Sequence, residues 1–422
     1  MYRYEAAFGA ADVTTKAMKT AIDDWFSLYY GSAAGEDSDP CQRIGCTVVE
    51  KLVRAIFGEY KLTGGSLGKA LDNIKEKALQ LALVGGECYL KPCPETAGFS
   101  FAPVSRKNVL IFARDSRGEP VDMGLTERCL EGSYYYTLLE RRRVKADALV
   151  IENKLYRSKS ADQLGQNVPL TTLSRYAQLQ EETVLPGVEG LGLVRLHTPM
   201  LNCVDGSNDG VSIYAAAAGL IRAVDENEAQ LRGEFQRGQS RIFVSADLLR
   251  GNQLEEHLFV GLDDDPEHVG VQIFAPALRE QSYLARKQEY LRNIESIIGL
   301  QRGMLSDANV EDRTATEIAA SAGQFNLTVM ALQHMWEQAV DGCFRLCTGL
   351  GKLFGLQVDA EHSIDWGNGT LYDEDKQWQS YLQMVDKGLL KPEIALGWRF
   401  NLPAETAQEQ AQIRSRLMPA AE

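Results

Sequence analysis

The stretch from Leu278 to Leu350 constrains the fold of this chain more than any other, because it predicts two helices separated by a polar break. In its first part, apolar residues recur in steps of three and four from Tyr283 to Ile298, which is the spacing of one helix face. The segment from Ser306 to Asn309 then has the composition of a loop. A second helical stripe follows, consisting of Ile318, Ala322, Phe325, Val329, Leu332, Trp336, Val340, Cys343 and Cys347.

The second helix has a predicted start and an unusual length. Thr314 and Glu317 have the spacing of a capping box, in which each side chain accepts a hydrogen bond from the other residue's backbone N–H. A helix that continues from there to Leu350 would be roughly 55 Å long at 1.5 Å per residue. Helices of compact domains usually have about 11–12 residues. The length is therefore typical of a chain that works inside an assembly.

Composition and charge exclude several classes of protein. The 422 residues are 45% hydrophobic and 24% charged, which is ordinary for a globular protein, and the length suggests two or three domains. No run of 18 or more apolar residues exists, so we expect no membrane span. The net charge of −14 argues against a protein that grips nucleic acid through a dominant basic surface. It is compatible with a protein past which nucleic acid slides.

Residues that could carry chemistry do not form a catalytic or metal-binding pattern. The eight cysteines and five histidines show no metal-ligand spacing. The segment Gly64–Ala70 lacks the first glycine and the final Ser or Thr of a phosphate-binding loop. Asp263, Asp264 and Asp265 could attract a cation, but the rest of an EF-hand loop is missing, so a solvated acidic turn is favoured. The sequence therefore predicts no metal, no cofactor and no enzyme.

The pattern along the chain predicts an α+β fold. Strand-rich sequence extends from Cys88 to Tyr156, with Arg141–Arg143 expected at the charged tip of a hairpin. Ser212 is expected to cap a helix that ends at Gly238. Other helices are expected at Ala11–Tyr30, Thr47–Phe57, Ser66–Val84, Asp373–Asp386, after Pro392, and at Pro403–Leu417.

A small acidic module separates the helix that ends at Gly238 from the one that begins near Leu278. Two strands are expected in it, at Arg241–Val244 and Val269–Phe274. Between Gln239 and Pro276 seven acids stand against two arginines, a net charge of −5, and the acids are Asp247, Glu255, Glu256, Asp263, Asp264, Asp265 and Glu267. This makes the module a poor phosphate binder and a good partner for a basic protein surface.

The order of these elements resembles that of the portal proteins of tailed phages, of the siphovirus type. The similarity extends over nearly the whole chain and rests on the order and spacing of five segments: Trp25–Gly31, Leu83–Pro92, Gly210–Tyr214, Arg241–Val244 and Thr314–Ile318. The resemblance implies a portal-like α+β fold with long stem and wing helices, a β-rich wing region and a small β-rich clip.

The resemblance also implies a division of the chain. The expected regions are a wing (1–208), a first stem helix (209–238), a clip (239–277), a second stem helix (278–300), a tunnel loop (301–313), a long wing helix with the segment after it (314–371) and a C-terminal helical region like a crown (372–422). Arg302, Ser306, Asp307, Asn309, Glu311 and Asp312 would face the DNA from the tunnel loop. Asp263, Asp264, Asp265 and Glu267 would belong to the docking surface of the clip.

The function implied by the resemblance is a dodecameric ring at one capsid vertex of a virion, assembled in the host cytoplasm. Double-stranded DNA would pass through its channel during packaging and ejection. Expected partners are other copies of the chain, the terminase large subunit, a head–tail adaptor, and capsid and scaffolding proteins, with no membrane. An acidic protein repels phosphates, so Arg302, Arg313, Arg286, Lys287 and Arg292 would supply only transient contacts.

Two other classes remain open from sequence. One is a cytosolic α+β enzyme, which would need a pocket with convergent polar groups. The other is a helical scaffold protein without a DNA channel. The mass of the oligomer separates them, because a portal forms a very large ring and most enzymes form small symmetric oligomers.

Overall fold

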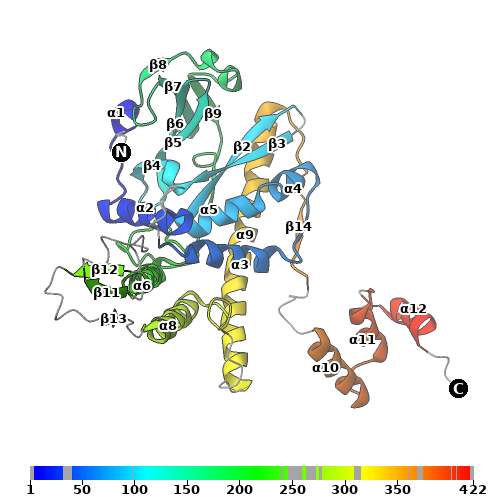
Figure 1. The fold of residues 1–422 in the computed structure, drawn as a ribbon. Coiled ribbons are helices and arrows are strands. Elements are labelled where there is room, and N and C mark those ends of the chain that lie inside the picture. Colours follow the sequence, from blue (N-terminus) through cyan, green and yellow to red (C-terminus); the bar gives the residue numbers. More distant parts are fainter. Residues whose placement is uncertain are drawn as a thin grey trace. The chain divides into compact units, whose positions relative to one another are not determined.

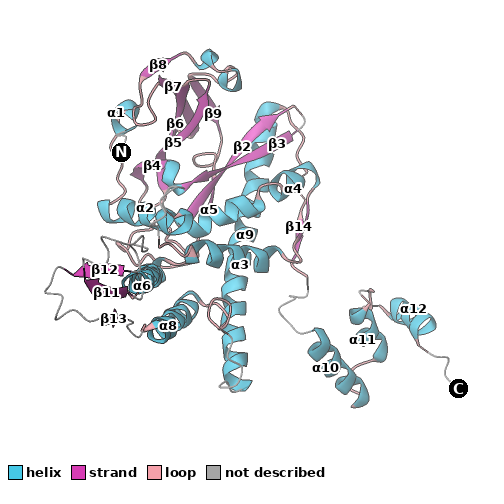
Figure 2. Cartoon of the chain, in the orientation of Figure 1, coloured by secondary structure: helices cyan, strands magenta, loops and turns pink. Residues whose placement is uncertain are grey.

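The computed structural model describes residues 4–31, 40–96, 98–238, 241–245, 259–262, 272–274, 278–307, 315–359, 361–367, 374–400, 402–404 and 406–418. The chain divides into two compact units. The first contains residues 1–54 and 64–362, and the second contains residues 55–63 and 363–422. Helices and strands both contribute, as Figure 2 shows, and the fold is α+β as expected.

Helices form the N-terminal part of the first unit: α1 (Tyr4–Phe8), α2 (Lys16–Tyr30), α3 (Ile44–Phe57), α4 (Gly65–Asp72) and α5 (Lys75–Gly85). Thr15 caps α2, because its Oγ1 accepts a hydrogen bond from the backbone N–H of Met18 at 3.1 Å. The single helix expected at Ser66–Val84 is divided into α4 and α5, since the backbone leaves helical bonding near Asn73. The final glycine pair acts as expected, with Gly86 in the left-handed conformation after α5.

The strands between Glu87 and His197 form two sheets beside these helices (Figure 1). The smaller sheet has the order β10-β2-β3, made of Val194–His197, Glu87–Glu95 and Gly98–Ser105. The larger has the order β4-β5-β6-β7-β8 with β9 also paired to β7, and its strands are Val109–Arg114, Pro120–Glu131, Tyr134–Lys145, Ala148–Ser158, Gln166–Val168 and Glu182–Pro186. Short 3₁₀ turns are η1 (Arg106–Asn108), η2 (Leu170–Thr172), η3 (Ser174–Tyr176) and η4 (Ala215–Ala217).

The charged hairpin tip expected at Arg141–Arg143 is wrong. These arginines lie within β6, and the turn to β7 is made by Ala146 and Asp147, both with positive φ. Two-residue turns of this kind match the twist of antiparallel strands. The three arginines are accommodated in the sheet because each pairs with a carboxylate of this sheet, Asp122, Glu140 or Glu152.

The long helix α9 (Ala315–Phe354) has 40 residues, which confirms the expected unbroken helix. Its predicted stripe is buried at Phe325, Val329, Leu332, Trp336, Val340, Cys343 and Cys347. Its C-terminal half packs against β10 and β2, where the site for a Cβ on Gly342 is 3.0 Å from Val194. Periodicity therefore identified the inward face of this helix.

Two further helices, α6 (Ala218–Arg237) and α8 (Glu280–Ile298), flank a small sheet of order β12-β11-β13. Its strands are Phe259–Leu262, Arg241–Ser245 and Gln272–Phe274. The strand β12 was not expected, and it pairs in parallel with β11. Ser212 does not cap α6: it donates from Oγ to the carbonyl of Leu83 at 3.1 Å, and the helix begins only after η4.

The second unit joins strand β1 (Lys61–Thr63) to β14 (Ser363–Asp365) and contains α10 (Glu374–Asp386), α11 (Pro392–Arg399) and α12 (Ala407–Leu417). The rings of Tyr60 and Trp366 are 5.0 Å apart beside the strand pair. All three helices were expected, and α12 starts later than predicted, at a capping box formed by Thr406 and Glu409. Among the described residues, no helix has the length and apolar character needed to cross a membrane.

Candidate functional site

The helices α6 and α8 lie side by side (Figure 1). They are antiparallel, because two residues in the middle of α6 bond to residues within α8, whereas Glu234, near the end of α6, pairs with Arg279, just before α8 begins. Asn227 donates to the carbonyl of Tyr283 at 3.1 Å, Lys287 pairs with Glu228 at 3.0 Å, and Arg279 pairs with Glu234 at 2.8 Å. The predicted role of this pair as stem helices stays a prediction.

Hydrogen bonds and an ion pair connect α6, α8 and the segment before α6 to the N-terminal part of the chain. The backbone N–H of Gln42 donates to Asp225 at 2.7 Å, and Gln42 in turn accepts from Lys287 at 3.1 Å. The fully buried Tyr214 donates from its hydroxyl to the carbonyl of Trp25 at 2.7 Å. Arg222 forms an ion pair with Asp24. Both helices are thus positioned by side chains that lie far away in the sequence.

The loop after α8 is organised by one carboxylate, that of Glu295. Its Oε1 accepts from the backbone N–H groups of Gly303, Leu305 and Ser306 at 3.1, 2.5 and 2.8 Å. Its Oε2 accepts from the Ser306 hydroxyl at 2.8 Å. The side chain of Gln288 adds a bond from the N–H of Asp307 at 2.8 Å. The role of Glu295 was not predicted from the sequence, because nothing in its spacing distinguishes it from other polar residues on the helix.

The residues predicted for the tunnel loop have different outcomes. The expectation that Ser306 is solvent-exposed is wrong: it is buried at 6% exposure against Glu295. Arg302 and Asp307 are exposed, as expected. Asn309, Glu311 and Asp312 lie outside the described residues, so their predicted place at the channel stays a prediction.

The other predicted site residues also stay predictions. Thr314, on which the expected helix cap depends, and Asp263, Asp264, Asp265 and Glu267 of the expected docking surface all lie outside the described residues. The side chain of Glu317 is outside them too. The helix α9 begins at Ala315, the residue directly after Thr314.

The basic residues of α8 differ in how closely they are bonded to other groups of the chain. Lys287 is half-buried and bonded to Glu228 and Gln42, so its charge is already matched within the chain. Arg286 is exposed and lies over the ring of Tyr290, 5.4 Å from its centroid. Arg292 is 3.7 Å from Glu289. Leu284 and Ile297 belong to the apolar face predicted between Tyr283 and Ile298, and the structure corrects this, because they are 39% and 45% exposed.

A buried network of ion pairs joins the sheets to the segment before α6. Glu87, which is 0% exposed, contacts Arg106 at 2.8 Å and Arg195 at 2.5 Å. Asp209 contacts Arg114 at 2.5 Å and Arg106 at 3.7 Å. Burial by itself would raise the pKa of Glu87, but the two guanidiniums outweigh it and the pKa lies below its ordinary value. The carboxylate is therefore charged and its role is to tie these elements together.

The same junction depends on two glycines in direct contact. A Cβ on Gly86 would lie 2.2 Å from the carbonyl of Gly210, and a Cβ on Gly210 would lie 2.2 Å from the carbonyl of Gly86. Gly86 also has a φ of 82°, which favours glycine. The backbones at the end of α5 and before α6 can approach this closely only because neither residue has a side chain.

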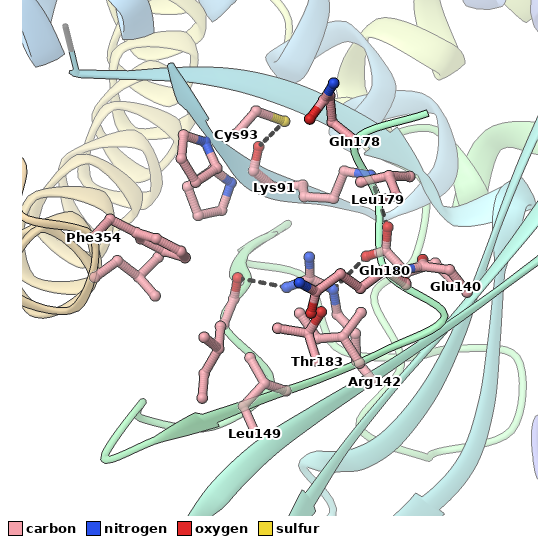
Figure 3. Close-up of a pocket in the computed structure, with 17 residues that line it drawn as sticks. Lys91, Cys93, Glu140, Arg142, Leu149, Gln178, Leu179, Gln180, Thr183 and Phe354 are labelled. Atoms are coloured by element: carbon pink, nitrogen blue, oxygen red, sulfur yellow. Dashed lines mark hydrogen bonds and ion pairs between the residues drawn. The ribbon is translucent and has the colours of Figure 1, made fainter. Parts of the chain in front are cut away.

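The first unit contains a cavity of about 450 Å³ between β2, the larger sheet and the end of α9 (Figure 3). Lys91 and Arg142 both point at Glu140, at 3.1 and 2.5 Å, and Arg142 also donates to the carbonyls of Leu191 and Gly192. Burial would raise the pKa of Glu140, but Arg142 and Lys91 lower it to about 2. The three charged side chains of this cavity, Lys91, Glu140 and Arg142, thus bond to one another.

The cavity is also lined by a cysteine, Cys93. Burial raises the pKa of Cys93, so the thiol rather than the nucleophilic thiolate is favoured. Its Sγ is 3.7 Å from the carbonyl of Lys91 (Figure 3). Within the part of the chain that the structure describes, no three His, Cys, Asp or Glu residues are grouped in a way that could hold a metal ion.

Comparison with known proteins gives a likeness in structure. No protein-family model matches the sequence, and no curated protein matches it. The structure is similar to a chain in the neck of the native GTA particle, computed with C12 symmetry, with a TM-score of 0.50 and 14% sequence identity. The match covers 94% of this chain and 97% of that chain. This chain therefore shares its α+β fold, over nearly its whole length, with that chain.

Proposed function

We propose that this chain is the subunit of a portal ring at one vertex of a phage-like capsid, a channel for DNA packaging and ejection. The observation that carries the proposal is the fold shared with a neck chain over 94% of this sequence. Its arrangement of an antiparallel helix pair flanking a small sheet, followed by a loop and a 40-residue helix, supports the same role. That neck was computed with C12 symmetry, which supports a ring near twelve subunits here.

Exposed apolar residues on α9 support contacts between copies of the chain. Leu327 and Met330 are 62% and 61% exposed and lie three residues apart, so they share one helix face. Side chains of this kind are favoured in the buried part of a subunit interface. We expect this face to pack on the neighbouring subunit of the ring.

Charge supports passage of DNA rather than tight binding. The net charge of −14 repels phosphates, and a channel with many basic contacts would bind DNA too strongly for it to move. Arg302 and Asp307, exposed after α8, provide one charge of each sign. We propose that the loop from 301 to 313 faces the channel and makes contacts that are brief and sensitive to salt.

The acidic module between α6 and α8 is proposed as the docking surface for the terminase large subunit and later the head–tail adaptor. Its seven acids and two arginines favour a basic protein surface as partner. Capsid and scaffolding proteins are proposed to contact the ring, which would lie in the virion. The chain is proposed not to be an enzyme, because the charged side chains in the cavity of Figure 3 (Lys91, Glu140 and Arg142) are paired with one another and burial raises the pKa of the Cys93 thiol.

Native mass spectrometry or electron microscopy of the purified full-length protein tests the proposal. We expect closed rings near twelve subunits. Leu327→Glu combined with Met330→Glu should reduce ring formation, whereas Leu201→Glu, at a residue that is 95% exposed, serves as the control and should leave it unchanged. A monodisperse monomer or dimer of the unaltered protein at micromolar concentration, at every salt concentration, would contradict the proposal.

Two sets of charge changes test the roles of the regions once rings form. Reversing Asp263, Asp264 and Asp265 to lysine should impair terminase or adaptor docking while rings still assemble. Replacing Asp307 and Glu311 with lysine should slow packaging or ejection without preventing assembly, because stronger phosphate contacts hold the DNA. Unchanged docking in the first variant, or unchanged transport in the second, would refute the role of that region alone.

A further inference from the structure

Three backbone N–H groups and a hydroxyl of the loop after α8 converge on one carboxylate, that of Glu295. N–H groups from closely spaced residues that point into one concavity form a site for anions. Those of Gly303, Leu305 and Ser306 all meet Oε1 of Glu295, and the Ser306 hydroxyl meets Oε2. The arrangement would suit a phosphate or carboxylate ligand, and the anion present is part of the chain itself.

We propose that Glu295 is an internal plug in an oxyanion site. Its carboxylate occupies hydrogen-bond donors that would otherwise bind a carboxylate or phosphate group from outside. The carboxylate is 1% exposed and lies on the last turn of α8 beside the buried Ile294 and Ile298. A charge in such surroundings is stable only when it is hydrogen-bonded, and four donors meet that need. Removing the carboxylate would leave the same four donors without their acceptor, which is also unfavourable.

The backbone of the same residue shapes the turn that brings the donors back. The carbonyl of Glu295 accepts from the N–H groups of Gly299 and Leu300 at 3.0 and 2.8 Å. Gly299 has a φ of 78°, in the left-handed region that ends helices, and this reverses the chain. A Cβ there would lie 2.4 Å from Oγ1 of Thr328 on α9, so the turn also lies against the long helix. The oxyanion site is therefore fixed by main-chain geometry and does not depend on the plug alone.

The plug has a consequence for DNA passage, and this consequence alone rests on the proposed function. Backbone N–H groups bind phosphates without regard to base sequence. In a channel, a loop with three free N–H groups aimed at one point would hold each passing phosphate. Because Glu295 fills this point, the loop offers passing DNA fewer donors.

Chemical rescue in the full-length protein tests the plug without any DNA. Glu295→Ala should lower the melting temperature by several degrees, and sodium formate or acetate should raise it again in a saturable manner. Inorganic phosphate should bind this variant, seen as broadening of the ³¹P resonance, and should not bind the unaltered protein. Glu289→Ala is the matched control, since that glutamate lies on the same helix with 63% of its side chain exposed. Formate should affect the control no more than sodium chloride of equal ionic strength.

A folded Glu295→Ala variant that neither formate, acetate nor phosphate stabilises beyond sodium chloride would overturn the plug. If that variant does not fold, Glu295→Gln keeps a carbonyl acceptor and removes the charge. Hydrogen exchange of the Leu305 and Ser306 amides should then be faster than in the unaltered protein, and unchanged exchange would overturn the idea.

The consequence for DNA is measured separately. Rings of Glu295→Ala should retain more double-stranded DNA at low salt than unaltered rings, and added formate should reverse the difference. Equal retention would overturn the consequence for transport. The absence of rings from the unaltered protein would contradict the proposed function and leave the rescue result to decide the plug.

Discussion

Two buried carboxylates in the first unit are stabilised in opposite ways. Glu87 is met by the guanidiniums of Arg106 and Arg195, and Arg195 lies 108 positions away in the sequence. Glu295 is met by four uncharged donors that lie 8 to 11 positions away. Long-range charge pairs thus join separate elements of the sheet region, whereas a local cap shapes the loop. The difference predicts that the two regions respond differently to loss of charge, to pH and to salt.

The largest effect is expected from breaking the long-range pairs. Arg106→Met leaves Glu87 buried with one guanidinium fewer, and removing one partner of a buried pair costs about 3–5 kcal/mol. Urea unfolding of the full-length protein measures the loss. Arg117→Met is the control, because Arg117 is 84% exposed in its pair with Asp115, and its unfolding midpoint should stay unchanged. Equal stability of the two variants would show that the network does not join the sheets as described.

Acid should weaken the charge-paired region through Glu140. Its folded pKa is about 2 against an ordinary 4.5, so its contribution is fully present above pH 4.5 and is lost as the pH falls from 4.5 toward 2. At about 1.4 kcal/mol per pKa unit the contribution is on the order of 3 kcal/mol. Glu140→Gln should therefore flatten the stability profile between pH 4.5 and 2. An acid limb as steep as that of the unaltered protein would contradict the pairing with Arg142 and Lys91.

The local cap should show a smaller loss when one donor is removed. Ser306→Ala deletes the hydroxyl that donates to Oε2 of Glu295, and hydrogen bonds to charged groups contribute about 1.5–3 kcal/mol. Thermal unfolding gives the difference, with Asp307→Ala as the neighbouring exposed control. Because the donors are uncharged, the loss should hardly change between low and high salt, and a strong salt dependence would argue for charge pairing here as well.

The smallest loss of stability is expected from removing an ion pair between α6 and α8. Lys287→Met removes the partly exposed pair with Glu228, and such pairs contribute about 0.2–1 kcal/mol. This loss should shrink as salt is added, unlike that of Ser306→Ala. Denaturant unfolding at two salt concentrations separates the two behaviours. A salt-independent loss above this range would place Lys287 with the buried network rather than with surface charge.

Sequence patterns predicted what depends on local periodicity. The buried face of α9 from Phe325 to Cys347 follows steps of three and four, which report one face of a helix directly. The helices after Tyr372 were found from their own composition. The capping pattern expected at Thr314 occurs in the described chain at Thr406 and Glu409, where both of its hydrogen bonds form.

Contacts between distant segments were missed. Ser212 has the composition of a helix cap, but its hydroxyl is used by the carbonyl of Leu83, 129 positions away. Ser306 lies in a polar stretch that suggests exposure, yet the carboxylate of Glu295 draws it inward. The available signal in the sequence was the pair of glycines at 299 and 303 after a helical glutamate. Both have positive φ, and the turn at Gly299 is what brings the loop back toward Glu295.

The length of α9 gives it the properties of a lever. With 40 residues it spans about 60 Å, so a rotation of about 5° at one end would move the other end by about 5 Å. Its C-terminal half rests on β10 and β2, and in its N-terminal half Thr328 donates to the carbonyl of Gly299 beside the loop. Thr328 lies about 39 Å from the C-terminal end of the helix at 1.5 Å per residue, so the same tilt would shift the residues beside Glu295 by about 3 Å.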